Sequence, residues 1–244
     1  MQGGFGMRHL HTVCALAFAL ALLALPGAAG AKAKPRPAPE PTLDERAAQV
    51  LDKACKALTG MKEFGFQAQV NLDLVHQDGS KIQTGRQMTV TVQRPGAFKV
   101  VTDADDIQAV TAFDGKTFTL ALPGRKLYGR IDAAMDTDAL MDMLAASYGI
   151  ESPLGDLLSN APCAKLSGAA DGYYIGKAKV DGAVCDHLFF QGRDVDWQIW
   201  VEDSPAALPR KLVITEKKLP SAPQFSAVLG AWKTGPLDKD ALAY

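Results

Sequence analysis

The sequence lacks the common motifs of catalysis. It contains no G-x-S-x-G elbow, no Walker loop and no H-E-x-x-H pair. Histidine is scarce: of four in the chain, His9 and His11 lie at the extreme N-terminus, leaving His76 and His187. These absences give no support to an enzyme, and we expect none.

The chain also lacks an excess of charge of either sign. It has 26 basic and 27 acidic residues, a formal net charge of −1. A nucleic-acid-binding protein needs a basic face or stripe, and attachment to anionic lipid needs clustered lysine and arginine. We therefore expect no nucleic-acid partner and no electrostatic attachment to membranes.

No apolar run is long enough to cross a bilayer, which takes roughly 20 residues. The longest, Val13–Leu25, follows the positive Arg8 and ends at Pro26. The small residues Ala29-Gly30-Ala31 form a cleavage site, so 1–31 is predicted to be a secretory signal peptide. We expect a periplasmic protein without a transmembrane segment after cleavage.

Cysteine is sparse, and no C-x2-C pair is present. This spacing predicts neither a metal site nor a cofactor. An exported chain permits disulfides, and Cys163 and Cys185 flank a stretch with two turn signals. We predict that these two pair, which would stabilise the fold by roughly 3 kcal/mol. Cys55 is then single and is interpreted as a small buried hydrophobe on a helix.

The remaining chain divides into a proline-rich linker at 32–41, one domain at 42–232 and a loose C-terminal tail at 233–244. Thr42 and Glu45 form a capping box that begins a helix, and Gly60 is predicted to end it in the left-handed conformation. A second helix is predicted over 132–148 and a short third one from Ser152-Pro153.

Alternation of apolar and polar residues begins at Phe66 and predicts strands with one buried face. Candidate strands, separated by Asp-Gly and Pro-Gly turns, are 66–74, 88–92, 97–102, 107–113, 118–122, 126–131, 173–178, 183–190, 195–202, 210–214 and 221–232. Short connections favour antiparallel neighbours. The fold class is therefore α+β, a curved antiparallel sheet with helices on one face.

Several segments resemble known proteins. The Asp-Gly-Lys-Thr stretch within 113–120 and the Leu-Pro turn within 200–212 look like those of LolA-like lipoprotein carriers. Segments 148–151, 153–158 and 194–214 resemble a family of predicted periplasmic proteins, domain of unknown function 2092, within the LolA-like superfamily. The resemblance implies an incomplete β-barrel whose helices cover the concave face, and an apolar concavity that in the superfamily contains acyl chains.

On this basis we predict a ligand-binding cavity on the apolar face of the sheet. Its expected lining is Phe66, Val70, Leu72, Met88, Val90, Phe118, Leu120, Leu140, Met143, Trp197 and Ile199. Met135, Met141 and Met143 suit a flexible ligand, with packing beneath the helix as the alternative.

Three other features have competing interpretations. Trp200 lies on the polar side of its strand and either lines a binding edge or packs on Val213 or a crossing loop. Cys185 and His187 point to the same face, but a disulfide and a surface histidine explain them better than a nucleophile does. The aspartates at 103, 105 and 106 are interpreted as a solvated turn, because they lack the ligand spacing of a calcium loop.

The leading hypothesis is a monomeric, non-catalytic periplasmic carrier of a hydrophobic or lipid-like ligand, such as a lipid or a lipoprotein acyl chain. The alternative is an envelope-stress or assembly factor that binds another protein through the barrel edge or the convex face. An exported hydrolase is the third candidate.

Overall fold

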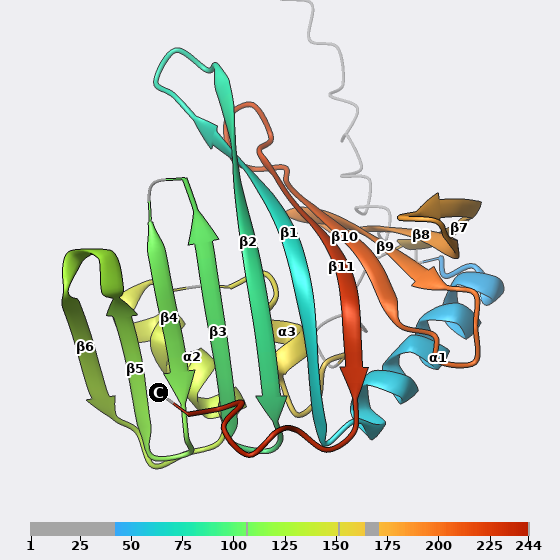
Figure 1. The fold of residues 1–244 in the computed structure, drawn as a ribbon. Helices are drawn as coiled ribbons and strands as arrows, with labels where there is room; N and C mark the ends of the chain where they lie inside the picture. Colours follow the sequence, from blue (N-terminus) through green and yellow to red (C-terminus); the bar gives the residue numbers. More distant parts are fainter. Residues whose placement is uncertain (1–41, 106, 151, 164–170, 244) are drawn as a thin grey trace, which may run out of the picture. The chain divides into compact units, whose positions relative to one another are not determined.

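Eleven strands form one antiparallel sheet in the computed structural model, which describes residues 42–105, 107–150, 152–163 and 171–243. The strand order is β6-β5-β4-β3-β2-β1-β11-β10-β9-β8-β7, so β1 and β11 join the two halves (Figure 1). The strands are β1 (Glu63–Val75), β2 (Lys81–Gln93), β3 (Ala97–Ala104), β4 (Gln108–Phe113), β5 (Thr117–Leu122), β6 (Leu127–Asp132), β7 (Asp171–Val180), β8 (Ala183–Gln191), β9 (Val195–Glu202), β10 (Pro209–Glu216) and β11 (Gln224–Thr234).

The sheet is curled and does not close, since β6 and β7 pair on one side only. The predicted curved antiparallel sheet is therefore confirmed. The predicted signal peptide and linker lie outside the described residues and stay predictions. Among the described residues, no helix is long and apolar enough to cross a membrane.

Alternation along the strands separates the sheet into two faces. In β1, Phe64, Phe66, Ala68 and Val70 are buried, whereas Gln67 between them is exposed. Successive side chains of a strand point to opposite faces, so these residues define an apolar inner face and a polar outer face. The register of β1 with β2 keeps this alternation across the hairpin, because Phe66 pairs with Val90 and Gln67 with Thr89.

In the described ranges, three α-helices cover the inner face: α1 (Glu45–Gly60), α2 (Thr137–Tyr148) and α3 (Gly155–Leu158). A 3-10 turn, η1 (Pro123–Arg125), precedes β6. They lie behind the sheet in Figure 1. Leu140 and Leu144 of α2 and Leu157 of α3 pack in the main core with β1–β5. Ala47 and Val50 of α1 pack in a second core against β8 and β9. The expected helical cover is confirmed.

The predicted helix ends were only partly correct. Asp44, not Thr42, caps α1: its Oδ1 accepts the N–H groups of Arg46 and Ala47 at 2.8 and 3.0 Å. The Thr42 backbone instead bonds Gly172 of β7. Gly60 is helical, and Met61 ends the helix in an extended conformation, so a left-handed Gly60 was wrong.

Two further helix starts differ from prediction. Asp132 ends β6, and α2 begins at Thr137 behind the cap Asp136, whose Oδ1 accepts the Ala139 N–H at 2.9 Å. The third helix begins at Gly155 rather than at Ser152-Pro153. The left-handed Gly149 that ends α2, with φ 62°, was predicted correctly as its stop.

The C-terminal segment lies against the outer face instead of hanging loose. Beyond β11, the Leu237 N–H donates to Glu63 Oε2 at 2.9 Å, and Lys99 Nζ donates to the Ala243 carbonyl at 2.5 Å. Figure 1 shows this segment crossing in front of the strands near their lower ends. Glu63 and Lys99 thus fix it to β1 and β3.

The predicted Cys163–Cys185 disulfide is wrong. Cys163 bonds Cys55 of α1, with a Cα–Cα distance of 5.7 Å, and Cys185 is a buried free thiol. Cys185 lies in strand β8 and pairs with Ala178 of β7 and Glu202 of β9. Because this backbone pairing fixes its position in the sheet, Cys185 does not reach Cys163 in the loop after α3. Cys55 faces that loop because the helix runs under it.

Removing the Cys55–Cys163 bond should destabilise the protein, because it joins residues 108 positions apart. For the double variant Cys55→Ala/Cys163→Ala we expect a loss of about 2–4 kcal/mol in unfolding free energy by urea titration. Alkylation of the unfolded, unreduced mature protein should label Cys185 alone. The control Cys185→Ala should leave no thiol to label. A cross-linked peptide containing Cys185 would contradict the assignment.

Candidate functional site

A mainly apolar pocket lies on the inner face, where α2 and the α3 segment meet β1, β10 and β11. Its volume is about 720 Å³. Its apolar lining comes from both layers: Leu72, Ile214, Leu219, Pro223 and Phe225 from the sheet side, and Met141, Ala145, Ile150 and Pro153 from the helix side.

The pocket forms because the central strands extend further than the helices that cover them (Figure 1). Leu72 near the end of β1 pairs with Phe225 of β11, which in turn pairs with Ile214 of β10. All three are only partly buried, and Phe225 packs against the edge of the main core. Met141 and Ala145 project from α2 on the facing side. The alternation that builds the core therefore continues into the pocket wall.

The predicted cavity residues all lie on the inner face, but most of them fill the protein's own cores. Phe66, Val70, Val90, Phe118 and Leu140 are buried in the main core, and Met88, Leu120 and Met143 pack against it. Ile199 is buried beneath α1, and Trp197 stacks on Phe190 at 3.8 Å in the same core. Leu72 is the member of this set that lines the pocket.

Sequence reasoning missed most of the pocket wall. Met141 was among the methionines proposed for a ligand surface and does line the pocket, whereas Met135 and Met143 pack on the main core. Ala145 and Ile150 carry no signal beyond their place near the end of a helix. Alternation places Ile214 on the inner face but does not reveal that the helices stop short of it.

The charged residues that line this pocket are acidic. Asp73 has its pKa held below the usual value, mainly by the backbone N–H of Gln224 at 3.1 Å and also by Lys81 at 3.2 Å. Asp138 accepts the Asn160 N–H at 3.0 Å. The described lining thus combines apolar walls with carboxylates at the rim.

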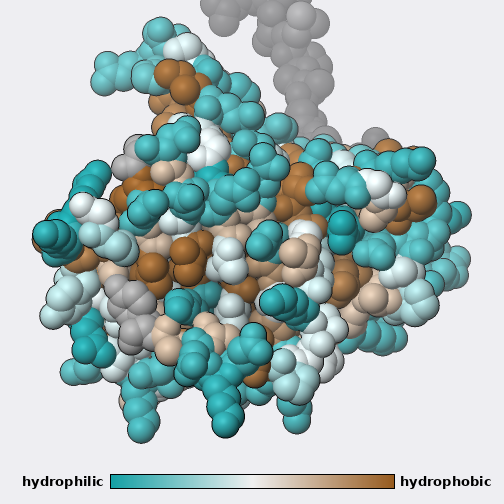
Figure 2. Space-filling model, in the orientation of Figure 1, coloured by the Kyte–Doolittle hydropathy of each residue, from teal (hydrophilic) through white to brown (hydrophobic). Residues whose placement is uncertain are grey.

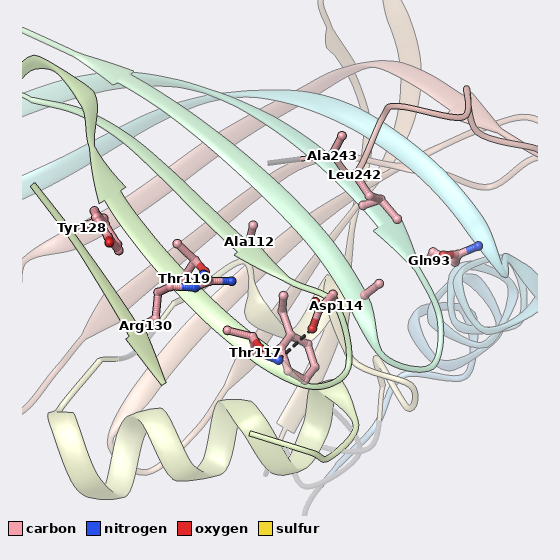
Figure 3. Close-up of a pocket in the computed structure, with 11 residues that line it drawn as sticks. Gln93, Ala112, Asp114, Thr117, Thr119, Tyr128, Arg130, Leu242 and Ala243 are labelled. Atoms are coloured by element: carbon pink, nitrogen blue, oxygen red, sulfur yellow. Dashed lines mark hydrogen bonds between the residues drawn. The ribbon is translucent and has the colours of Figure 1, made fainter. Parts of the chain in front are cut away.

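A second pocket, of about 610 Å³, lies on the outer face between β3–β6 and the C-terminal segment (Figure 3). Thr117, Thr119 and Arg130 line it from the strands, and Leu242 lies on the far side. Asp114 does not face it as a free acid, because its Oδ1 accepts the Thr117 N–H at 2.7 Å. Figure 2 shows this face of the molecule as mixed polar and apolar surface. The lining does not match an oily ligand.

Cys185 and His187 do not form a catalytic pair. Burial raises the pKa of the Cys185 thiol, so it is not the thiolate that nucleophilic attack requires. The His187 Nε2 lies 2.9 Å from Gln198 Oε1, and burial lowers the pKa of its ring. His187 is therefore half-buried, not the surface histidine that was expected, and it lies on the face opposite the pocket.

Trp200 is covered within its own sheet. It stacks on His187 with ring centroids 4.0 Å apart, and Lys211 Nζ lies 4.8 Å from its ring. Lys211 is its partner across the ladder, and Val213 pairs with Gln198, so the predicted packing on Val213 stays a prediction. Packing, rather than a binding edge, accounts for this residue.

The acidic turn after β3 gives no metal site. No group of three potential metal ligands occurs in the part of the chain that the structure describes, and Asp106 lies outside it.

A buried acid fastens α1 to the sheet. Asp186 of β8 lies 2.8 Å from the Tyr174 hydroxyl, which donates to it, and 2.9 Å from Lys177 Nζ. Arg46 of α1 lies 3.7 Å from the same carboxylate and stacks over the Tyr174 ring. Burial by itself would raise the pKa of Asp186, but these donors outweigh it and lower the pKa.

Comparison with known families identifies the chain. Residues 47–242 match the family described as "Predicted periplasmic protein (DUF2092)". The chain belongs to this family. The resemblance that the sequence motifs suggested is thus confirmed, and the description names the periplasm, in agreement with the predicted export. A search of curated proteins found no significant match.

Solved structures share the fold at low sequence identity. LprF from Mycobacterium bovis is 14% identical with a TM-score of 0.52, over 82% of this chain and 97% of that one. The lipoprotein LppX of Mycobacterium tuberculosis is 10% identical (TM-score 0.49; 80% and 98% covered). The LolA superfamily protein NE2245 of Nitrosomonas europaea is 12% identical (TM-score 0.42; 81% and 97%). The likeness to LprF supports the fold and nothing finer.

Replacing Asp186 by Asn should destabilise the fold in a pH-dependent way. Because the folded pKa of Asp186 is lowered, the carboxylate stabilises the fold above its unfolded pKa, and this is lost as pH falls through the folded pKa. At pH 7 we expect Asp186→Asn to lose about 1.5–3 kcal/mol in chemical denaturation. The difference in unfolding free energy between Asp186→Asn and the unmodified protein should become smaller below about pH 4.

Asp181→Asn, at the exposed tip of the same hairpin, is the matched control and should change stability little. A gap between Asp186→Asn and the unmodified protein that stays constant down to pH 2 would contradict the role given to this carboxylate.

Proposed function

We propose that this protein is a non-catalytic carrier that binds a hydrophobic or lipid-like ligand in the inner-face pocket. The observation that carries the proposal is the pocket of about 720 Å³ between the uncovered ends of β1, β10 and β11 and the helices. Small-molecule sites are commonly apolar concavities of roughly 300–1,000 Å³.

The wall chemistry supports an aliphatic ligand. Leu72, Ile214 and Phe225 offer apolar surface from the sheet, and Met141 adds an unbranched, polarisable side chain that adapts to irregular shapes. Each methylene moved from water into such surroundings contributes about 0.8 kcal/mol. A ligand with a short alkyl chain would therefore gain useful affinity without specific hydrogen bonds.

The non-catalytic part of the proposal rests on the placement of the reactive side chains. Cys185 and His187 lie on the outer face, away from the pocket, and the Cys185 thiol has a raised pKa. Ser152 and Ser159 do line the pocket, but its described lining contains no histidine to activate them.

Binding of another protein is a second candidate, favoured by the open edges of the sheet. Leu127 and Tyr128 of the edge strand β6 are exposed, as are Tyr173 and Ile175 of the edge strand β7. An extended segment can add to such an edge through backbone hydrogen bonds. The Leu43 bridge to Gly172 covers the first residues of β7 and leaves the rest of that edge for a partner.

Filling the pocket should weaken ligand binding. Ala145 lines it, and Trp at this position would occupy volume that the ligand needs. With the uncharged dye N-phenyl-1-naphthylamine as a fluorescent probe, we expect Ala145→Trp to raise the Kd at least about tenfold, the equivalent of two lost methylene contacts. Mass spectrometry of organic extracts of the gently purified protein should detect co-purified aliphatic molecules.

The neighbouring Ala146 is exposed on the same helix and does not line the pocket, so Ala146→Trp is the matched control. It should leave the dye affinity unchanged. Absence of dye binding in the unmodified protein, or equal loss in both variants, would refute the carrier proposal. Unchanged dye affinity in Ala145→Trp would show that the dye binds outside this pocket and would contradict the proposed site.

A further inference from the structure

We propose that the inner-face pocket selects amphiphiles with a positively charged head group over anionic ones with the same alkyl chain. This inference rests on the proposed function and specifies its ligand class. Every charged side chain among the described residues that line the pocket is a carboxylate: Asp73, Asp138, Asp142, Asp156 and Glu216.

These carboxylates surround the apolar wall rather than gathering in one loop. Asp73 belongs to β1, Asp138 and Asp142 to α2, Asp156 to α3 and Glu216 to β10. A head group at the rim would therefore meet carboxylates from both layers, Asp142 from the helices and Glu216 from the sheet. The apolar wall between them takes the alkyl chain.

Among the described residues, the lysines near the rim leave Asp142 and Glu216 without an ion pair. Lys217 Nζ lies 2.7 Å from Asp196, and Lys218 Nζ lies 2.6 Å from Asp194, so both bind acids outside the pocket. Lys81 pairs with Asp73 alone, at 3.2 Å.

Arg94 lies beside Asp138, but its guanidinium donates its hydrogen bonds to backbone carbonyls, among them those of Ser159 and Leu157.

Asp142 and Glu216 are the carboxylates best placed to meet a ligand. Neither has an ion-pair or side-chain hydrogen-bond partner among the described residues, and they face the pocket from opposite layers. A carboxylate or sulfate head group would be brought next to like charges in a site partly shielded from water, where Coulomb interactions are stronger than in bulk solvent. An ammonium group there gains attraction instead.

The test compares two surfactants with the same twelve-carbon chain, dodecyltrimethylammonium and dodecyl sulfate, each below its micellar concentration. Both compete with bound N-phenyl-1-naphthylamine on the full mature protein. We expect the cation to displace the dye at concentrations at least about tenfold lower than the anion at low salt. The preference should shrink as ionic strength rises.

Charge removal identifies the residues responsible. The double variant Asp142→Asn/Glu216→Gln should reduce the cation preference severalfold, measured as the ratio of the two surfactant concentrations that displace half of the dye from that variant. Glu45→Gln/Asp52→Asn makes the same charge change on the exposed side of α1, outside the pocket, and should leave the preference intact.

The outcomes separate the two proposals. Dye binding with equal displacement by both surfactants, or stronger displacement by the anion, overturns the charge selection and leaves the carrier function standing. A preference that survives in Asp142→Asn/Glu216→Gln but falls in Glu45→Gln/Asp52→Asn also overturns it. Failure of the dye to bind at all overturns the carrier function, and the inference falls with it.

Discussion

The guanidinium of Arg94 joins two parts of the helical layer to the end of a central strand. Arg94 follows β2, and its side chain donates to the carbonyls of Leu58 and Met61 at the end of α1 and to those of Leu157 and Ser159 around α3, at 2.5 to 2.8 Å. The last carbonyls of a helix lack partners within it. Arginine suits this task because its planar fork offers five donors and stays charged even when burial lowers its pKa.

The helices are therefore attached to one another and to the sheet at the end where β2 turns into β3. Arg94 and the Cys55–Cys163 bond both tie α1 to the α3 segment, near the turn between β2 and β3. Within the described part of the chain, no side-chain hydrogen bond or ion pair is found between the far ends of β1, β10 and β11 and the three helices. The pocket lies at this free end, so the same interactions that fix the helical cover also determine where the apolar face remains uncovered.

The sheet was predictable because its signal is local. Phe66 and Val70 alternate with polar residues, and that period of two fixes both the strand and its buried face. The disulfide was not predictable, since the choice between Cys55 and Cys185 depends on which residue of α1 meets the loop after α3. Arg94 appeared in the sequence only as part of a turn, because its four acceptors come from segments up to 65 residues away.

The candidate site shows why an apolar face does not by itself locate a ligand. Phe118 and Leu140 belong to the predicted cavity, yet both are buried in the main core, because a helix covers that part of the sheet. Alternation cannot distinguish a face covered by the protein's own helix from one covered by a ligand. That distinction depends on where the cover ends, and there the apolar wall is bordered by acids such as Asp142 and Glu216. The acidic residues at the rim, rather than the apolar face of the sheet, can therefore give the pocket its selectivity.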